Sequence, residues 1–240
     1  MKNNFFNKLY FFLTRKRKSK ISGKIIVFEG IDGSGKETQF KLFIELLRKL
    51  RVPFKTFDFP QYQKTIGGKI LRFVLDGKFC NPSDIPIKLF SFFYALDRKT
   101  VANEIRKASR QNYVVALNRY TTSNKGHQTW KFKTLEEQEE YLAWLEKLEH
   151  DDLGIPQEDI VVFFDLNIEN ALMLINKRQR GTDKVETDVD YLTNSLEMYR
   201  KLAQKYSHWI TIKCEGENGV LLLPETIHKK TVDTIIERLK

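Results

Sequence analysis

Short runs of β-branched and aromatic residues alternate with longer segments whose apolar positions recur with helical spacing. The short runs predict five strands, at residues 24–29, 54–58, 113–117, 159–165 and 209–213. The longer segments predict helices near 35–50, 66–76, 84–108, 134–149, 168–176, 187–205 and 224–239. Strands that alternate with helices form a parallel sheet covered on both faces. We therefore expect an α/β fold with a five-stranded parallel sheet flanked by helices.

The first predicted strand runs directly into a glycine-rich loop. Residues 30–36 read Gly-Ile-Asp-Gly-Ser-Gly-Lys, and the first predicted helix begins there. The backbone N–H groups of such a loop and the N-terminus of the helix bind phosphate, and the lysine adds a full positive charge. This combination predicts a P-loop that binds a nucleoside triphosphate. We expect nucleotide contacts from Gly30, Gly33, Ser34, Gly35, Lys36, Glu37 and Thr38, with Lys36 as a catalytic residue.

One position departs from the P-loop pattern. The pattern has Ser or Thr directly after the lysine, where its hydroxyl holds Mg2+. This chain has Glu37 there, and the hydroxyl comes one residue later, at Thr38. Nucleoside monophosphate kinases are similar, because many of them have a Thr-Gln pair at this later place. Glu37 itself fits the first turn of a helix, where the helix dipole favours a carboxylate that faces solvent.

Charge is distributed unevenly along the chain. The formal net charge is +10, but residues 1–24 hold eight Lys and Arg residues and no acidic residue, which leaves +2 for the other 216. We expect residues 1–21 to form a basic extension and 22–240 to form a single folded domain. Two interpretations of the extension stay open. In the first, it is a disordered extension, or the start of the chain is assigned too far upstream. In the second, it is a tether to a membrane surface or to nucleic acid.

The sequence carries no recognisable signal for export or membrane insertion. No apolar run approaches the length of a membrane span, and the N-terminus has neither a long apolar stretch nor a small-residue cleavage site. The two cysteines, Cys80 and Cys214, are far apart and lack metal-binding spacing, which indicates a reducing compartment. We therefore expect a cytoplasmic protein.

Polar motifs follow the second and third predicted strands. Residues 58–62 read Asp-Phe-Pro-Gln-Tyr, and residues 118–128 read Asn-Arg-Tyr-Thr-Thr-Ser-Asn-Lys-Gly-His-Gln. Ligands of a parallel sheet bind beyond the carboxyl ends of its strands, where both motifs lie. The guanidinium of Arg119 could hold a phosphate bidentately there, or it could form an ion pair at the rim of the sheet. On the long helix between the motifs, Tyr94 and Arg98 are four residues apart and face one side.

Together with the P-loop, these motifs make residues 22–205 similar to the thymidylate kinase family, P-loop kinases that phosphorylate dTMP with ATP. The resemblance implies the three-layer P-loop NTPase fold with a short lid, a bound Mg2+ and a homodimer. It also implies that ATP lies on the P-loop and that dTMP lies between the ends of the second and third strands. The dTMP contacts that it implies are Asp32, Phe59, Tyr62, Tyr94, Arg98, Arg119, Ser123, Asn124 and Gln128.

The resemblance implies a role for several of these residues. Phe59 and Tyr94 stack around the thymine, and Arg98 contacts its carbonyl. Arg119 binds the acceptor phosphate as a catalytic residue, and the group that meets the 3′-hydroxyl is Asp32. Two alternatives follow from the residues alone and stay open. Tyr94 could pack in the core, and Ser123 could cap the next helix.

A basic cluster, residues 177–180, lies where the family has its lid. Some family members have a basic residue inside the P-loop, where this chain has Gly33 and Ser34. We therefore expect Arg178 or Arg180 to be catalytic and to stabilise the charge of the transferring phosphoryl group. The alternative is a solvated cluster that only aids the encounter with anionic nucleotides.

A second departure from the family pattern concerns Mg2+. The family usually has Asp directly before Arg119, whereas this chain has Asn118, which keeps a hydrogen-bonding oxygen but has no charge. Three carboxylates could compensate, those of Glu29, Glu37 and the lid residue Glu186. Of these, we select Glu186 as the metal ligand.

The predicted function is transfer of the γ-phosphoryl group of ATP to dTMP, which gives dTDP. Two alternatives stay open: a kinase for another pyrimidine monophosphate, and a catalytically impaired homologue that binds nucleotide. Glu37 and Asn118 favour the impaired homologue. We do not expect His127 to be a general base, because the attacking phosphate oxygen is already ionised. We expect this histidine to pack by its edge or to contact the base.

Overall fold

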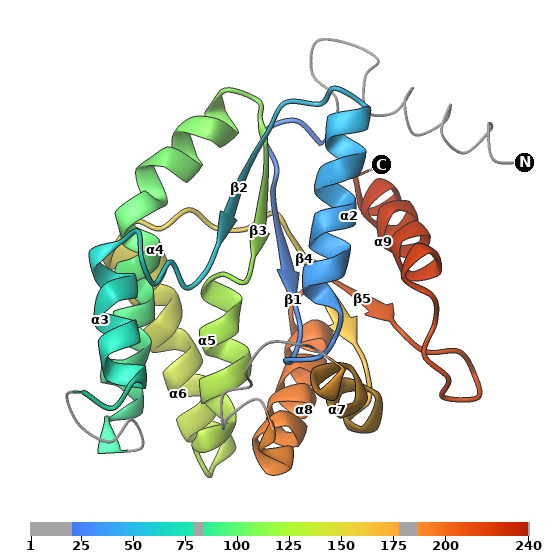
Figure 1. The fold of residues 1–240 in the computed structure, drawn as a ribbon. Coiled ribbons are helices and arrows are strands. Elements are labelled where there is room, and N and C mark those ends of the chain that lie inside the picture. The colour runs from blue at the N-terminus through green and yellow to red at the C-terminus, as the bar shows by residue number, and fades with distance from the viewer. Residues whose placement is uncertain (1–20, 79–83, 178–186, 240) are drawn as a thin grey trace, which may run out of the picture.

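The computed structural model describes residues 21–78, 84–177 and 187–239, and Figure 1 shows their fold. Five strands form one parallel sheet in the order β2-β3-β1-β4-β5, so β1 lies in the middle. Their bounds are Ile25–Glu29 for β1, Phe54–Asp58 for β2, Val114–Asn118 for β3, Ile160–Asp165 for β4 and Trp209–Lys213 for β5. All five predicted strands are confirmed, each within one residue.

The seven predicted helices are also confirmed, with ends shifted by at most three residues. They are α2 (Lys36–Lys49), α3 (Ile66–Leu75), α4 (Ile87–Arg110), α6 (Leu135–Glu146), α7 (Ile168–Asn176), α8 (Val189–Lys205) and α9 (Pro224–Arg238). Two features differ from the prediction. A further helix, α5 (Thr121–Gln128), follows β3 and leads into a short 3₁₀ turn, Thr129–Lys131. The end of the predicted 134–149 helix is a π-helical segment, Lys147–Asp152.

Helices cover both faces of the sheet. The pair α2 and α9 packs together on one face, and α4 and α8 pack on the other (Figure 1). The central strands β1 and β3 are buried throughout, which explains their continuous apolar sequences. The edge strand β2, Phe-Lys-Thr-Phe-Asp, mixes apolar and polar residues and exposes three of its five residues. The three-layer α/β fold expected from the sequence is therefore present.

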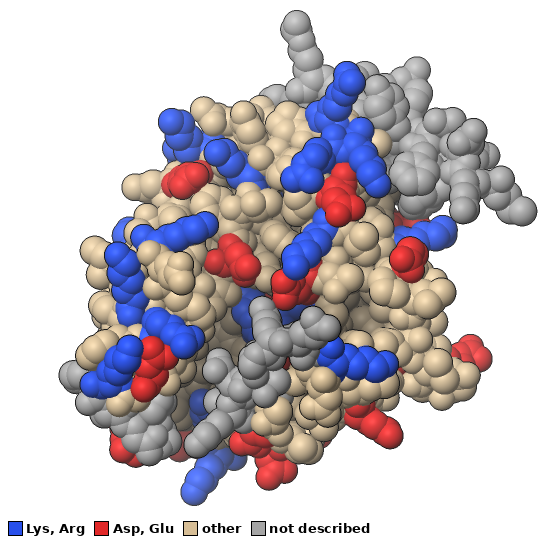
Figure 2. Space-filling view, in the orientation of Figure 1, with Lys and Arg blue, Asp and Glu red and all other residues tan. Residues whose placement is uncertain are grey.

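The surface of the described part carries both signs of charge. Figure 2 shows basic and acidic side chains interspersed over one face, which agrees with the near-neutral charge of the chain after its first 24 residues. Ile21, the last residue of the predicted extension, is 2% exposed and packs in the core. Among the described residues, we find no helix with the length and hydrophobicity that a membrane span requires.

The carboxyl ends of β2, β3 and β1 are aligned in one row. In the strand register, Asn118 of β3 lies opposite Asp58 on one side and Phe28 on the other. Backbone bonds continue the row beyond the strands: the N–H of Phe59 donates to the carbonyl of Asn118, and the N–H of Arg119 donates to that of Phe28. The Phe59–Pro60 peptide bond is cis. The P-loop after β1 and the motifs after β2 and β3 therefore meet at a single edge of the sheet.

Candidate active site

Two glycines give the P-loop its shape for different reasons. Gly33 and Gly35 have φ angles of 81° and 78°, in the left-handed region that favours glycine. A Cβ atom on Gly33 would lie 2.3 Å from the carbonyl oxygen of Ala171 on α7, so close packing also excludes a side chain there. A Cβ atom on Gly35 would meet no atom within 4 Å. Gly35 directly precedes α2, so this open space lies at a helix N-terminus, where phosphate is favoured.

Two polar side chains of the loop face its interior. Lys36 is 6% exposed, and its Nζ lies 3.1 Å from the carbonyl oxygen of Ile31 and 3.4 Å from Oδ1 of Asp32. The hydroxyl of Ser34 is buried and has no hydrogen-bond partner among the described residues. A buried hydroxyl of this kind is normally bonded. The loop therefore offers a cation and an unsatisfied donor at the place where the sequence predicts phosphate.

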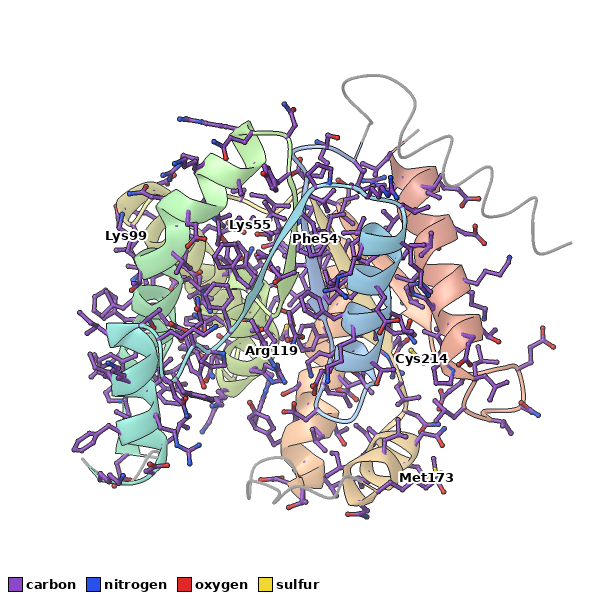
Figure 3. The ribbon with its side chains drawn as sticks, turned by 45° about the horizontal axis from the view of Figure 1, so that its top comes forward. Phe54, Lys55, Lys99, Arg119, Met173 and Cys214 are labelled. Atoms are coloured by element: carbon purple, nitrogen blue, oxygen red, sulfur yellow. The ribbon has the colours of Figure 1, made fainter. Side chains whose placement is uncertain are left out.

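Arg119 connects the P-loop to the acceptor side of the predicted site. Its Nη2 donates to Oδ1 of Asp32 at 2.5 Å, and its Nη1 donates to Nε2 of His127 at 2.8 Å. Figure 3 shows Arg119 in the middle of the molecule, between α5 and α2. The predicted rim ion pair is thus present, but its partner belongs to the P-loop.

The charges in this cluster fix the protonation of its members. Burial favours the neutral acid, but Arg119 and Lys36 outweigh it and hold the pKa of Asp32 well below its usual range. Burial and the neighbouring guanidinium hold the pKa of His127 well below its usual range. His127 is therefore a neutral hydrogen-bond acceptor for Arg119, and its ring stacks on Tyr191 with centroids 5.6 Å apart. The ring also packs edge to face against Tyr199, with centroids 5.4 Å apart, and the expectation that His127 is not a general base stays a prediction.

The two aromatic residues that were expected to enclose the base have different ring partners. Phe59 is 4% exposed, and its ring packs against Tyr120 with centroids 5.8 Å apart. Tyr94 contacts Phe90 edge to face at 5.2 Å. Burial, with a smaller contribution from the hydroxyl of Tyr62, raises the pKa of Tyr94 above its usual range. Stacking of Phe59 and Tyr94 on the base stays a prediction.

Arg98 and Asn124 are bound to one carboxylate inside the protein. Nε and Nη2 of Arg98 lie 3.0 and 2.8 Å from the two oxygens of Glu149, and its Nη1 donates to the carbonyl of Tyr120. Nδ2 of Asn124 lies 3.0 Å from the same carboxylate and 3.1 Å from the carbonyl of Ser91. Sequence reasoning missed Glu149, which lies in an acidic segment without any motif. The base contacts of Arg98 and Asn124 stay predictions.

A second buried carboxylate, that of Glu29 at the end of β1, organises α5. It is 0% exposed and accepts four bonds, whose donors are Tyr120 N (3.1 Å), Thr122 Oγ1 (2.7 Å), Ser123 Oγ (2.7 Å) and Tyr199 OH (2.9 Å). Three of these bonds end on Oε1 and one on Oε2, and the suggestion that Glu29 compensates as a metal ligand stays a prediction. The hydroxyl of Ser123 binds this carboxylate and does not cap α5, whose N-cap is Tyr120.

The remaining predicted residues have mixed surroundings. The side chain of Gln128 accepts a bond from Lys131 at 2.7 Å. Glu37 pairs with Lys41 one turn along α2 at 2.7 Å, as expected for a residue that faces solvent, and Thr38 is exposed. Arg178, Arg180 and Glu186 lie outside the described residues. Over the described ranges, no three His, Cys, Asp or Glu side chains converge as a metal site would require.

Asn118 forms one bond across the strand ends and leaves one atom unpaired. Its Nδ2 donates to Oδ1 of Asp58 at 2.9 Å. Its Oδ1 is buried and finds no hydrogen-bond partner in the described part of the chain. Asp58 is exposed, and its electrostatic neighbours include Glu37, Arg119 and Lys36. An amide oxygen and a carboxylate thus lie side by side near the P-loop cation.

Comparisons with known proteins agree with this geometry. The thymidylate kinase family model matches residues 28–221. The thymidylate kinase of Leptospira interrogans is 31% identical over 195 residues, which cover 81% of this chain and 86% of the relative. That of Mycobacterium tuberculosis is 25% identical over 210 residues, which cover 82% and 94%. The structure of thymidylate kinase from Candida albicans, 20% identical, matches with a TM-score of 0.69 over 91% of this chain and 94% of that one, which supports the fold. The chain belongs to the thymidylate kinase family.

Proposed function

We infer that the protein transfers the γ-phosphoryl group of ATP to dTMP and releases dTDP and ADP. Its membership of the thymidylate kinase family supports this reaction. The observation that carries the inference is the ion pair between Arg119 and Asp32, because it joins a phosphate-binding loop to a second phosphate-binding cation. Two phosphate sites on one edge of a sheet are what a kinase with a phosphate acceptor requires.

Each charged group has a place in the proposed reaction. Lys36 and the N–H groups of the loop bind the outer phosphates of ATP. Arg119 binds the acceptor phosphate with the fork of its guanidinium, which a lysine could not reproduce. Asp32 and His127 hold that guanidinium in position before the acceptor arrives. Catalysis then consists mainly of positioning and charge stabilisation, because the attacking phosphate oxygen is already ionised.

Thymidylate kinases normally use Mg2+, and the side chains beside the P-loop could bind this ion. Mg2+ binds few protein ligands, commonly one or two carboxylates, together with waters and substrate phosphates. The exposed carboxylate of Asp58 and the unpaired Oδ1 of Asn118 are oxygen atoms of this kind beside the P-loop. When bound, the metal would neutralise charge on the β- and γ-phosphates.

A coupled assay of ADP release tests the reaction. The wild-type protein is assayed with ATP, Mg2+ and, in turn, dTMP, dUMP, UMP, CMP and AMP. We expect the highest kcat/KM with dTMP, and no turnover above background with Lys36→Ala, which controls for contaminating kinases. Preference for another pyrimidine monophosphate would correct the acceptor, and no turnover with any acceptor would overturn the enzyme assignment.

Three further points belong to the proposal. The family resemblance supports a homodimer, which light scattering on the purified protein would test.

The lid residues keep their predicted roles. These are phosphoryl transfer for Arg178 and Arg180, and metal binding for Glu186. We propose a cytoplasmic location and assign residues 1–20 no part in catalysis, so their deletion should leave kcat unchanged.

A further inference from the structure

At two positions where the P-loop pattern and the family pattern have an oxygen ligand for Mg2+, this chain has a different residue. The residue after the P-loop lysine is Glu37 rather than Ser or Thr, and the residue before Arg119 is Asn118 rather than an acid. Glu37 is paired with Lys41 on the outer face of α2. Glu29 is enclosed by four donors. Besides the lid residue Glu186, a carboxylate at the strand ends could therefore supply the missing negative charge.

Asp58 lies where it can replace the lost carboxylate. It is the last residue of β2 and lies opposite Asn118, the last residue of β3, in the parallel register. Neighbouring strands are about 4.8 Å apart, so the two side chains leave the sheet at the same edge, one strand apart. The bond of 2.9 Å from Nδ2 of Asn118 to Oδ1 of Asp58 joins the carboxylate to the side chain at position 118.

The two side chains of this pair have oxygen atoms that a cation could bind. Asn118 is 8% exposed, and its Oδ1 has no hydrogen-bond partner within the described ranges, so an acceptor is buried without a donor. Such an atom is normally satisfied by a water, an ion or a ligand. Asp58, in contrast, is exposed and so is accessible from solvent. Its electrostatic neighbours are Glu37 and the two proposed phosphate-binding cations, Arg119 and Lys36, which supports a position beside the proposed phosphate sites.

We propose that Asp58 supplies a carboxylate for Mg2+ in this protein, and that the Asp58–Asn118 pair does what a single acid before Arg119 would do. The negative charge has moved from the end of β3 to the end of β2, and Asn118 contributes its neutral oxygen. From the proposed function, this inference needs only that the site binds a nucleotide with Mg2+. It accounts for Asn118 without assuming loss of activity.

Metal binding, measured without an acceptor, tests the proposal. Mn2+ is titrated into protein saturated with ADP, and free Mn2+ is followed by electron paramagnetic resonance. We expect Asp58→Asn to raise the Mn2+ dissociation constant by about tenfold or more. The matched control is Asp233→Asn, which removes an exposed carboxylate paired with Lys229 on α9, and should leave the constant unchanged. Circular dichroism and thermal unfolding check that each variant is folded.

The exchange variant, Asp58→Asn combined with Asn118→Asp, makes the test specific. It returns the charge to the end of β3 and keeps one carboxylate and one amide in the pair. We expect it to restore Mn2+ affinity to within about threefold of the wild type. An unchanged constant in Asp58→Asn would overturn the proposal, and so would an exchange variant that folds but does not recover. Because no acceptor is present, a failure of the dTMP assignment would leave this measurement intact.

Discussion

Polar groups on the P-loop side of the site and on the α4–α5 side differ in what they bind. In the P-loop, the hydroxyl of Ser34 has no partner among the described residues, and a side chain at Gly35 would enter open space. On the other side, Arg98 and Asn124 are bound to the carboxylate of Glu149 and are at most 2% exposed. One half is built to accept a ligand, and the other half is already bonded within the protein.

The difference shows how one site separates binding from support. Groups in the loop gain their partners when phosphate binds, so their loss should reduce turnover and leave the fold unchanged. Groups in the α4–α5 half satisfy each other, so their loss should affect stability first. Arg119 lies between the halves, because its guanidinium is bonded to Asp32 of the loop and to His127 of α5.

The largest expected effect is on the P-loop side, from Lys36→Ala. We expect kcat/KM for dTMP phosphorylation to fall by on the order of 10³-fold, since a positioned cation is lost from the transferring phosphates. The free energy of unfolding should change by less than about 1 kcal/mol. Lys41→Ala, on the exposed face of the same helix, is the control and should keep full activity. Activity within a few-fold of the wild type in Lys36→Ala would mean that the loop does not bind the nucleotide.

On the other side, Glu149→Ala should act on stability. Its loss leaves the guanidinium of Arg98 buried without its counter-ion, which costs about 3–5 kcal/mol. Urea unfolding measures this loss. Glu139→Ala, which breaks the exposed pair with Lys205, should cost at most about 1 kcal/mol. Equal effects of the two variants would contradict the distinction between the two halves.

A smaller loss of stability is expected from Glu29→Gln. The amide keeps the size of the side chain, but its NH2 group cannot accept a hydrogen bond, so at least one buried donor loses its acceptor. We expect a cost of about 1–3 kcal/mol in urea unfolding. Glu197→Gln, at an exposed position on α8, should be neutral. No loss in Glu29→Gln would show that the donors around Glu29 find other partners.

The smallest expected effect is a pH dependence of stability from His127. The unfolded chain binds a proton on this residue near the ordinary pKa of 6.5, whereas burial and Arg119 hold the folded pKa well below it. Stability is therefore complete above this value and falls as the pH decreases, by at most about 1.4 kcal/mol per pH unit. Urea unfolding of the wild type and of His127→Gln across this range checks the sign. The same slope in both proteins would mean that His127 is not neutral when folded.

The sequence predicts the sheet well because its strands are buried. The runs that form β1 and β3 each begin with four apolar residues and end in a polar one, a pattern typical of a strand buried on both faces whose carboxyl end reaches a site. It fails for α5, whose sequence Thr-Thr-Ser-Asn-Lys-Gly-His-Gln has weak helix propensity and no apolar stripe. That helix is held from outside, by Glu29 and by the ring of Tyr199, against which Gly126 packs without room for a Cβ atom.

The same contrast applies to the site. The P-loop follows from a local motif, because its backbone and one lysine form the phosphate site. The partners of Arg98 and Asn118 could not be predicted, because Glu149 and Asp58 are 51 and 60 residues away in the chain. Glu149 belongs to no motif, and Asp58 opens the motif of residues 58–62 without any sign of its partner, so each becomes informative only when the fold places it beside that partner.

Arg119 has a backbone φ of 62°, a conformation that arginine adopts only at a cost of about 1–2 kcal/mol and that glycine adopts freely. Glycine at this position would relieve that cost, but it would also leave the partly buried carboxylate of Asp32 without its counter-ion, which opposes the gain. The ion pair therefore holds the backbone of Arg119 in a conformation that arginine seldom adopts alone. Geometry that the local sequence disfavours is maintained here by a contact with a residue 87 positions away in the chain.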